Sequence, residues 1–392
     1  MTLNILVAPS GFKESLSAHE VANAITTGVK LALPDAEVFA VPMVDGGEGF
    51  TQALVEFTGG TSHGLTATGP VGNPVQSHFG FLGGTRNKHA VLEMAAAAGL
   101  RLVPRHARDP RNTTSHGVGE LIRATLDAGA ERILVGCGDS GINDGGAGMA
   151  QALGVRLLDD RGEEIGFGGG ELARLRHIDL SGRDPRLDRV RIDAAVNWHN
   201  VLLGPRGVAR VFGPQKGATP EIVEELDEAL ENYADVIRRD VGVDVGAMPG
   251  SGASGGLGAG LAALLGGRLH PRYEIVMRYI DLDHLLKRAD IVFTAEGCLD
   301  AQTPWGKVPA EVARRAKRYG LPVVALAGTV GEGASTNLEH GIDAYFSIVD
   351  CPCSLQESID KAHQLVANAA EQVARTLRLW SNQLVPEQRL TA

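Results

Sequence analysis

The chain has 392 residues and a formal net charge of −10, so we expect more than one domain and no affinity for nucleic acids. No block of basic residues occurs, and no apolar run approaches the roughly 18 residues of a membrane span. The chain starts without the basic segment of a signal peptide, and its four cysteines form no Cys-x-x-Cys pattern. These features predict a cytoplasmic protein that does not bind membranes.

The first sixty residues alternate strand and helix. An apolar run at 3–7 predicts a buried strand, and Ser17 with Glu20 fits a capping box before a helix that ends at Pro34. A second strand at 37–42 and a second helix at 49–57 follow. This order predicts a parallel sheet with both faces covered.

The middle of the chain differs from its two ends. Residues 64–92 alternate short strands with glycine turns, 117–153 suit either of two sheets, and 220–240 carry the apolar stripe of a long helix. Short apolar runs then return at 289–293, 322–327 and 344–348, and Ser354 with Glu357 predicts a last helix ending near Trp380. The pair Cys351 and Cys353 is expected to stay reduced, although a metal site or a strained disulfide is an alternative.

The fold class is therefore α/β with two domains. We expect a Rossmann-like parallel-sheet domain, discontinuous in sequence, from residues 1–64 and 285–380. A second, mixed α/β domain is inserted at 65–284, with a ligand cleft between the two, and 381–392 form a frayed tail.

Four loops rich in glycine and acidic residues each follow a predicted strand, where ligands bind in open α/β sheets. They span 8–15, 44–49, 136–146 and 294–307, and helices follow them. Glycines let backbone N–H groups approach an anion at a helix N-terminus, and acids among them suit a cation. None of the loops is a Walker A or G-x-G-x-x-G sequence. The residues alone thus predict a phosphate or carboxylate ligand together with Mg²⁺.

Distinctive motifs occur in these loops and in the middle of the chain. They are Phe-Lys-Glu-Ser-Leu-Ser-Ala at 12–18, Asp-Gly-Gly-Glu-Gly at 45–49, Asn-Asp-Gly-Gly-Ala-Gly-Met at 143–149, Val-Phe-Gly-Pro-Gln-Lys-Gly-Ala at 211–218, Gly-Gly-Leu-Gly-Ala-Gly at 255–260, and Gln302-Thr303 with Gly306-Lys307. Together these stretches resemble the type I glycerate kinases. The resemblance covers about residues 1–380. It implies a Rossmann-like domain, a second domain and a cleft, and an ATP- and Mg²⁺-dependent transferase that phosphorylates the 2-hydroxyl of D-glycerate.

The loops and the resemblance together give the expected site residues. Carboxylates suit general bases and metal ligands, and lysines neutralise a transferring phosphoryl group. The expected catalytic residues are Lys13, Asp45, Asp144, Glu296 and Asp300, with Asp45 and Glu296 as metal ligands. The expected cofactor-binding residues are Gly46, Gly47, Glu48, Gly255, Gly256, Gly258 and Lys307. The expected substrate-binding residues are Ser10, Gly11, Asp139, Ser140, Asn143, Asn197, Trp198, His199 and Cys298.

Structural explanations compete with these roles. Asp45 and Glu48 could offset a helix dipole, Asn143 and Asp144 could be ordinary N-caps, and the glycines at 255–258 could serve close packing.

Some loop residues depart from the pattern that is usual in the family. The family has Asp-Ser where Ser10 and Gly11 stand, acids near Asn197, and an Arg where Cys298 stands. A cysteine cannot give the bidentate carboxylate contact of an arginine. The departures fall in loops expected to face the cleft rather than in helices, so we expect them to line one altered acceptor pocket. Alternatives are a kinase for a bulkier hydroxy-acid or sugar-like acceptor, and a catalytically degenerate ligand-binding homologue. The expected partner is a small-molecule substrate, and self-association is left open.

Overall fold

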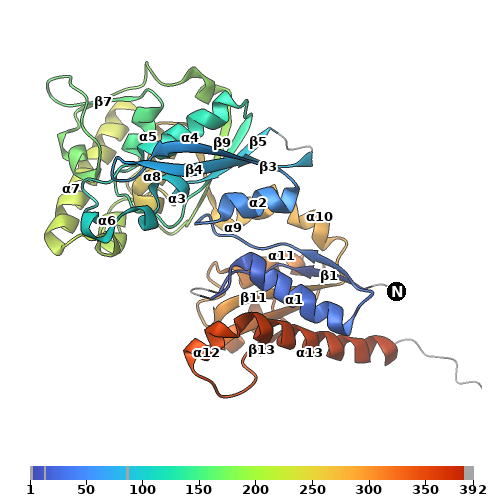
Figure 1. Cartoon of the computed structure of the whole chain (residues 1–392). Coiled ribbons are helices and arrows are strands. Elements are labelled where there is room, and N and C mark those ends of the chain that lie inside the picture. Colours follow the sequence, from blue (N-terminus) through green and yellow to red (C-terminus); the bar gives the residue numbers. More distant parts are fainter. Residues whose placement is uncertain (1–2, 13–14, 85–87, 384–392) are drawn as a thin grey trace, which may run out of the picture. The chain divides into compact units, whose positions relative to one another are not determined.

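The computed structural model describes residues 3–12, 15–84 and 88–383, which form two compact units (Figure 1). The first unit is Met1–Val44 with Val276–Ala392, and the second is Asp45–Ile275. The insertion is predicted at 65–284, whereas the contacts place its limits at 45 and 275. Helix α2 (Phe50–Thr58) and strand β3 (Thr61–Thr68) account for much of the difference. Helix α2 packs on β3 and on two further strands of the second unit, β4 (Pro74–Phe81) and β5 (His89–Glu93).

The first unit contains a five-stranded parallel sheet. Its strand order is β13-β12-β11-β1-β2, with β13 at Ala344–Ser347, β12 at Val323–Val330, β11 at Ile291–Leu299, β1 at Asn4–Val7 and β2 at Glu37–Ala40. Val7 pairs with Phe293 on one side and Ala40 on the other. The chain leaves β1 toward one edge of the sheet and β11 toward the other. The carboxyl ends of β1 and β11 therefore form the switch point at which such sheets bind ligands.

Helices of this unit start where the sequence places them. The capping boxes at Ser17 and Ser354 are both present, and α1 (Ala18–Ala32) buries Val21, Ile25 and Val29. The predicted last helix is divided into α12 (Leu355–Asp360) and α13 (Ala362–Gln383), and α13 lies beside α1 (Figure 1). The other elements are α9 (Arg272–Tyr279, shared with the second unit), α10 (Leu282–Leu286), α11 (Val308–Lys317) and the 3-10 helix η7 (Ala334–His340). The part of the expected frayed tail at 384–392 lies outside the described residues.

The second unit is built on a six-stranded mixed sheet of order β10-β9-β6-β5-β4-β3. Strands β10 (Arg268–Pro271), β9 (Arg191–Val196), β6 (Arg132–Gly136) and β5 (His89–Glu93) are parallel, and β4 (Pro74–Phe81) and β3 continue antiparallel. A separate antiparallel pair joins β7 (Arg156–Leu158) to β8 (His177–Asp179). The four parallel strands bring four loops to one edge of the sheet.

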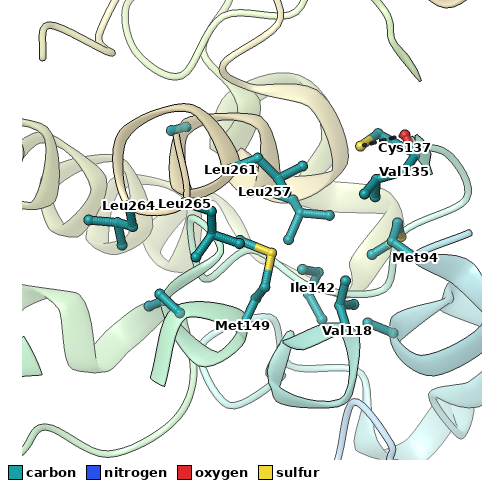
Figure 2. Close-up of a cluster of buried hydrophobic side chains, with 14 of the residues drawn as sticks. Met94, Val118, Val135, Cys137, Ile142, Met149, Leu257, Leu261, Leu264 and Leu265 are labelled. Carbon is teal, nitrogen blue, oxygen red and sulfur yellow. Dashed lines mark hydrogen bonds between the residues drawn. The ribbon is translucent and has the colours of Figure 1, made fainter. Parts of the chain in front are cut away.

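Helices pack on this sheet around one apolar core. They are α3 (Ala95–Ala98), α4 (His116–Asp127), α5 (Ala147–Ala152), α6 (Val208–Phe212), α7 (Pro220–Asp240) and α8 (Ala253–Ala263), with short 3-10 helices η2 (Leu100–Leu102), η3 (Arg105–Ala107), η4 (Gly169–Arg174), η5 (Pro185–Asp188) and η6 (Pro214–Lys216). Figure 2 shows Ile142 in the same buried cluster as Met149 and Leu257. The loop after β6 is therefore anchored by its own side chain in the core.

Most predicted elements are confirmed, and a further correction concerns the segment at 294–307. The loop predicted to start at Thr294 is still strand, because β11 pairs with β12 as far as Leu299 and Val330. Residues 117–153 lie in the second unit as α4, β6 and α5. Among the described helices, none combines the length and apolarity needed to cross a membrane. The four cysteines are free thiols in this structure.

We predict that Gly28→Ala destabilises the first unit. A Cβ at Gly28 would lie 2.1 Å from the Ala367 carbonyl oxygen, where α1 contacts α13. Alanine favours a helix over glycine by about 1 kcal/mol, but forcing the two helix backbones apart costs more. We therefore expect the free energy of unfolding to fall by roughly 1–2 kcal/mol. Urea unfolding of the variant and of Asn23→Ala, an exposed control on α1, measures this; equal stability of the two variants would contradict it.

Candidate functional site

A polar cluster lies at the end of β11 in the first unit. We call Glu296, Asp300, Thr303 and Lys307 the carboxylate–lysine cluster. The Lys307 Nζ lies 2.9 Å from Asp300 Oδ1 and 3.7 Å from Glu296 Oε2, and it donates to the Cys298 carbonyl at 3.0 Å. The Thr303 hydroxyl donates to Glu296 Oε1 at 2.5 Å. One ammonium and one hydroxyl thus hold two carboxylates in fixed positions.

The two carboxyl groups of this cluster differ in acidity. Burial raises the pKa of Glu296 to about 7, against the opposing bond from Thr303 and the charge of Lys307. Burial also acts to raise the pKa of Asp300, but the bonds from Lys307 and from the Gln302 N–H outweigh it and leave the pKa below its usual value. At neutral pH Asp300 is therefore ionised, while Glu296 can hold or release a proton. When two neighbouring carboxyl groups differ in pKa in this way, one suits the stabilisation of positive charge and the other suits proton transfer.

Two residues predicted for substrate binding adjoin this cluster. Ser10, just after β1, donates from its backbone N–H and its hydroxyl to the Ala295 carbonyl at 2.9 and 3.0 Å. The Cys298 thiol lies 3.7 Å from Asp300 Oδ2. Together with Gly11 they lie at the β1–β11 switch point. Lys13 falls outside the described residues.

In the second unit, the loop Asp45–Glu48 lies over the ends of β6 and β9. We call this loop, with Asp139, the acid edge. A Cβ on Gly47 would lie 2.2 Å from Asp139 Oδ2, so a larger residue there would displace the Asp139 carboxylate. The Glu48 N–H donates to Asp139 Oδ2 at 3.0 Å. The conformation of the acid edge is therefore fixed by hydrogen bonds to its own carboxylates.

Two arginines face the acid edge. Arg101 Nε lies 3.0 Å from Glu48 Oε1, and Arg272 Nη1 lies 3.3 Å from Asp45 Oδ2. Burial nevertheless raises the pKa of Glu48, and Arg101 opposes that effect. Both arginines come from segments that the sequence analysis does not connect with this loop.

Another acidic residue predicted for catalysis, Asp144, is fully buried, and both of its carboxylate oxygens accept hydrogen bonds. Its oxygens accept from the Ser115 N–H and hydroxyl at 2.7 and 2.8 Å and from the N–H groups of Gly146 and Gly148 at 3.1 and 3.2 Å. Helix α5 begins at Ala147 with Gly146 as its N-cap, so neither Asn143 nor Asp144 is the N-cap considered from the sequence. These bonds give Asp144 a structural function, and its catalytic role stays a prediction.

Asn143 presents the opposite case. It is fully buried, yet its amide nitrogen and oxygen have no hydrogen-bond partner in the described part of the chain. An unpaired buried amide is costly, so a ligand or an ordered water is the expected partner. Asn143 thus stays a predicted substrate-binding residue, with its backbone held by the bonds of the adjacent Asp144.

A buried lysine that the sequence analysis does not single out lies at the same loop. Lys216, at the end of η6, is 2 % exposed and donates to the Ile142 carbonyl at 2.5 Å. Burial lowers its pKa to about 7, although the charge of Asp144 opposes this. The matching stretch at 211–218 contains Lys216, but its spacing gave no sign that the side chain turns inward.

The glycines at the start of α8 have a packing explanation. A Cβ on Gly255 would lie 1.9 Å from the Ile142 carbonyl oxygen, and one on Gly258 would lie 2.2 Å from the Gly250 carbonyl oxygen. Gly256 likewise approaches the backbone of Gly145, which donates to the Gly255 carbonyl. Backbone therefore fills the space next to these glycines, and their contact with a cofactor stays a prediction.

The remaining predicted residues lie at the ends of β6 and β9. Ser140 forms a β-bridge with Gly99, and the Asn197 side chain accepts from the His199 N–H at 3.2 Å. Trp198 is 38 % exposed and His199 is exposed as well. Ser10, Gly11 and Cys298 belong to the first unit and the others to the second. Their grouping in one acceptor pocket therefore stays a prediction, as does the pairing of Asp45 with Glu296 as metal ligands.

The donor atoms of the carboxylate–lysine cluster fit a magnesium ion. Mg²⁺ binds through one or two carboxylates and completes its shell with water and phosphate oxygens. Glu296 and Asp300 supply two such carboxylates within one ammonium's reach. Within the described residues, no group of three or more His, Cys, Asp or Glu side chains could enclose a metal alone. The arrangement therefore suits an ion that arrives with a phosphate ligand.

We predict that Lys216→Met changes the pH dependence of stability. A lysine whose pKa falls from 10.5 unfolded to about 7 folded makes the native state gain stability as the pH rises between those values. The methionine variant lacks this gain, so its stability relative to wild type should fall by roughly 2 kcal/mol between pH 7.5 and 9.5. Urea unfolding at both pH values measures it, with Lys30→Met as the surface control. Parallel pH profiles of wild type and Lys216→Met would contradict the prediction.

Comparisons with known proteins show the family of this chain. The glycerate kinase family model matches residues 5–378. The glycerate kinase of Bacillus subtilis (strain 168) is 45 % identical over 377 residues, which cover 96 % of this chain and 98 % of that protein. The glycerate 2-kinase of Escherichia coli (strain K12) shows the same identity and the same coverage.

A solved structure gives the same result for the fold. The crystal structure of a Salmonella typhimurium LT2 protein assigned as glycerate kinase 2 matches with a TM-score of 0.87 and 46 % identity. The match covers 97 % of this chain and 100 % of that chain. The expected α/β fold is thereby confirmed, and the chain belongs to the glycerate kinase family.

Proposed function

We propose that this protein transfers the γ-phosphoryl group of ATP to the 2-hydroxyl of D-glycerate, with Mg²⁺ as cofactor. The observation that carries the proposal is the carboxylate–lysine cluster at the switch point of a parallel sheet. Its ammonium, its ionised Asp300 and its near-neutral Glu296 are the groups that phosphoryl transfer to an alcohol requires. The choice of D-glycerate as the acceptor rests on the glycerate kinases among the relatives of this chain.

Each residue of the cluster has a distinct part in this proposal. Lys307 neutralises charge on the phosphoryl group, and Asp300, held ionised by Lys307, binds the metal. Glu296 either completes the metal site or removes the proton of the attacking hydroxyl, since its pKa of about 7 lets it accept a proton at neutral pH. Bound Mg²⁺ would add electrostatic stabilisation of the phosphate oxygens.

Neither alternative from the sequence analysis is favoured. A degenerate homologue would have no use for a buried glutamate tuned to neutral pH, and Glu296, Asp300 and Lys307 are all in place. A bulkier acceptor rests on Trp198 and His199, whose side chains are exposed rather than built into a closed pocket. A cytoplasmic location belongs to the proposal as well, because free cysteines suit a reducing compartment.

We predict that Glu296→Gln lowers kcat by two orders of magnitude or more. Glutamine keeps the size of the side chain and can still accept from Thr303, but it neither takes up a proton nor carries charge. Because ionised Glu296 is the active form, wild-type activity should fall as the pH drops below about 7. Steady-state kinetics with D-glycerate from pH 5.5 to 8.5, with thermal melts as a folding check, measures both. Turnover near the wild-type rate would remove Glu296 from the mechanism.

We also predict that turnover needs a divalent cation. Hard carboxylate oxygens favour Mg²⁺ or Mn²⁺ over softer metals. Excess EDTA should therefore abolish formation of phosphoglycerate, and Mg²⁺ added beyond the chelator should restore it. Detection of ADP and phosphoglycerate by chromatography measures this. Undiminished transfer in EDTA would exclude a metal-dependent reaction.

A further inference from the structure

Arg272 occupies a distinctive place in the second unit. It is the first residue after β10, and Asn197 is the first residue after the neighbouring strand β9. The last residues of the two strands, Pro271 and Val196, pair in register. The two side chains therefore start side by side at the carboxyl edge of the sheet, where ligands bind. Asp45 of the acid edge lies against this point, through its contact with Arg272.

The guanidinium of Arg272 is held in place, but few of its N–H donors form hydrogen bonds. Its central carbon lies 4.7 Å from the centroid of the Tyr273 ring, a cation–π contact with a side chain that is itself buried. Its single hydrogen bond in the described part of the chain is the 3.3 Å contact from Nη1 to Asp45. A guanidinium offers five N–H donors, so most of its binding capacity remains.

The other arginine at the acid edge is less suitable. Arg101 has a closer ion pair with Glu48, at 3.0 Å, and its side chain is 57 % exposed, against 28 % for Arg272. A half-exposed arginine is screened and mobile, so it contributes little to specific binding. Of these two guanidiniums, Arg272 is thus the one that is both positioned and available.

An anionic acceptor needs such a group. Three carboxylates, of Asp45, Glu48 and Asp139, surround this edge and repel an acid. We propose that Arg272 binds the carboxylate of the hydroxy-acid acceptor in a bidentate contact, and so determines its specificity. This inference rests on the proposed function, because it names the residue that recognises the proposed acceptor.

The long contact between Arg272 and Asp45 is consistent with an arginine that changes partner when the acceptor binds. Arg272 rests on Asp45 until an acceptor carboxylate offers two parallel N–H···O bonds in place of one long contact. A simpler explanation is that Arg272 only pins the acid edge to the start of α9. The two explanations differ in what they predict for acceptors that lack a carboxylate.

The test compares Arg272→Lys with Arg101→Lys. Both substitutions keep the charge and lose the planar fork, and each alters one arginine that pairs with the acid edge. We expect Arg272→Lys to raise KM for D-glycerate by about tenfold to a hundredfold with kcat nearly unchanged, and Arg101→Lys to change KM by less than about threefold. Turnover of glycerol, which has no carboxylate, should change little in either variant. Calorimetric titration of D-glycerate without nucleotide should show the same loss of affinity.

The possible outcomes distinguish failure of the inference from failure of the proposed function. Equal KM effects in the two variants, or equal effects on D-glycerate and glycerol, would overturn the role of Arg272 while leaving the kinase proposal in place. A wild type that binds D-glycerate through Arg272 but does not phosphorylate it would overturn the kinase proposal alone. A wild type that neither binds nor phosphorylates D-glycerate would overturn both. Thermal melts of both variants exclude loss of folding as the cause.

Discussion

The ammonium of Lys307 sets the chemistry that the first unit can support. It contacts Asp300 closely and Glu296 at a longer distance. It therefore holds Asp300 ionised, whereas the pKa of the more buried Glu296 stays at about 7. Without this cation two carboxylates would face each other in a partly buried place, and their repulsion would keep at least one protonated. With it, the cluster keeps negative charge for a metal and a proton acceptor within one strand end and its turn. The parallel sheet supplies the position, burial raises the pKa of Glu296, and Lys307 keeps Asp300 ionised.

Much of the fold follows from local sequence patterns. Alternating apolar runs locate the strands of both sheets, and the residues Ser17 and Ser354 mark two helix starts, because a capping box depends on neighbours only three positions apart. The length of β11 could not be predicted in this way. Glu296 and Cys298 look like loop residues because they are polar or flanked by glycine, yet pairing with β12 keeps them in the strand. Long-range pairing overrides local composition there.

The site residues also differ in whether nearby sequence is enough to predict them or a distant contact is needed. Loop positions after strands predict Glu296, Asp300 and Lys307, since those residues lie within twelve positions of one another. Arg272 touches Asp45 across 227 positions, and no spacing in one sequence reports such a contact. Lys216 is hidden for a different reason. A lysine after Pro-Gln reads as a surface residue, and only the packing of η6 against the loop at Ile142 turns its charge inward.

The loop from Ile142 to Gly146 shows where the second unit accepts a cost in stability. Lys216 bonds the Ile142 carbonyl, Tyr233 bonds the Gly145 carbonyl at 3.2 Å, and the Asp144 side chain bonds the N–H groups that follow. Two of these groups, Lys216 and Asp144, are ionisable and buried, an arrangement that apolar side chains of similar size could often replace without loss of stability. What the bonds hold still is the backbone of Asn143, whose own amide is left without a partner in the described chain. A rigid backbone beneath an unsatisfied amide is the arrangement expected of a preorganised ligand contact, since the cost of ordering is met before the ligand arrives.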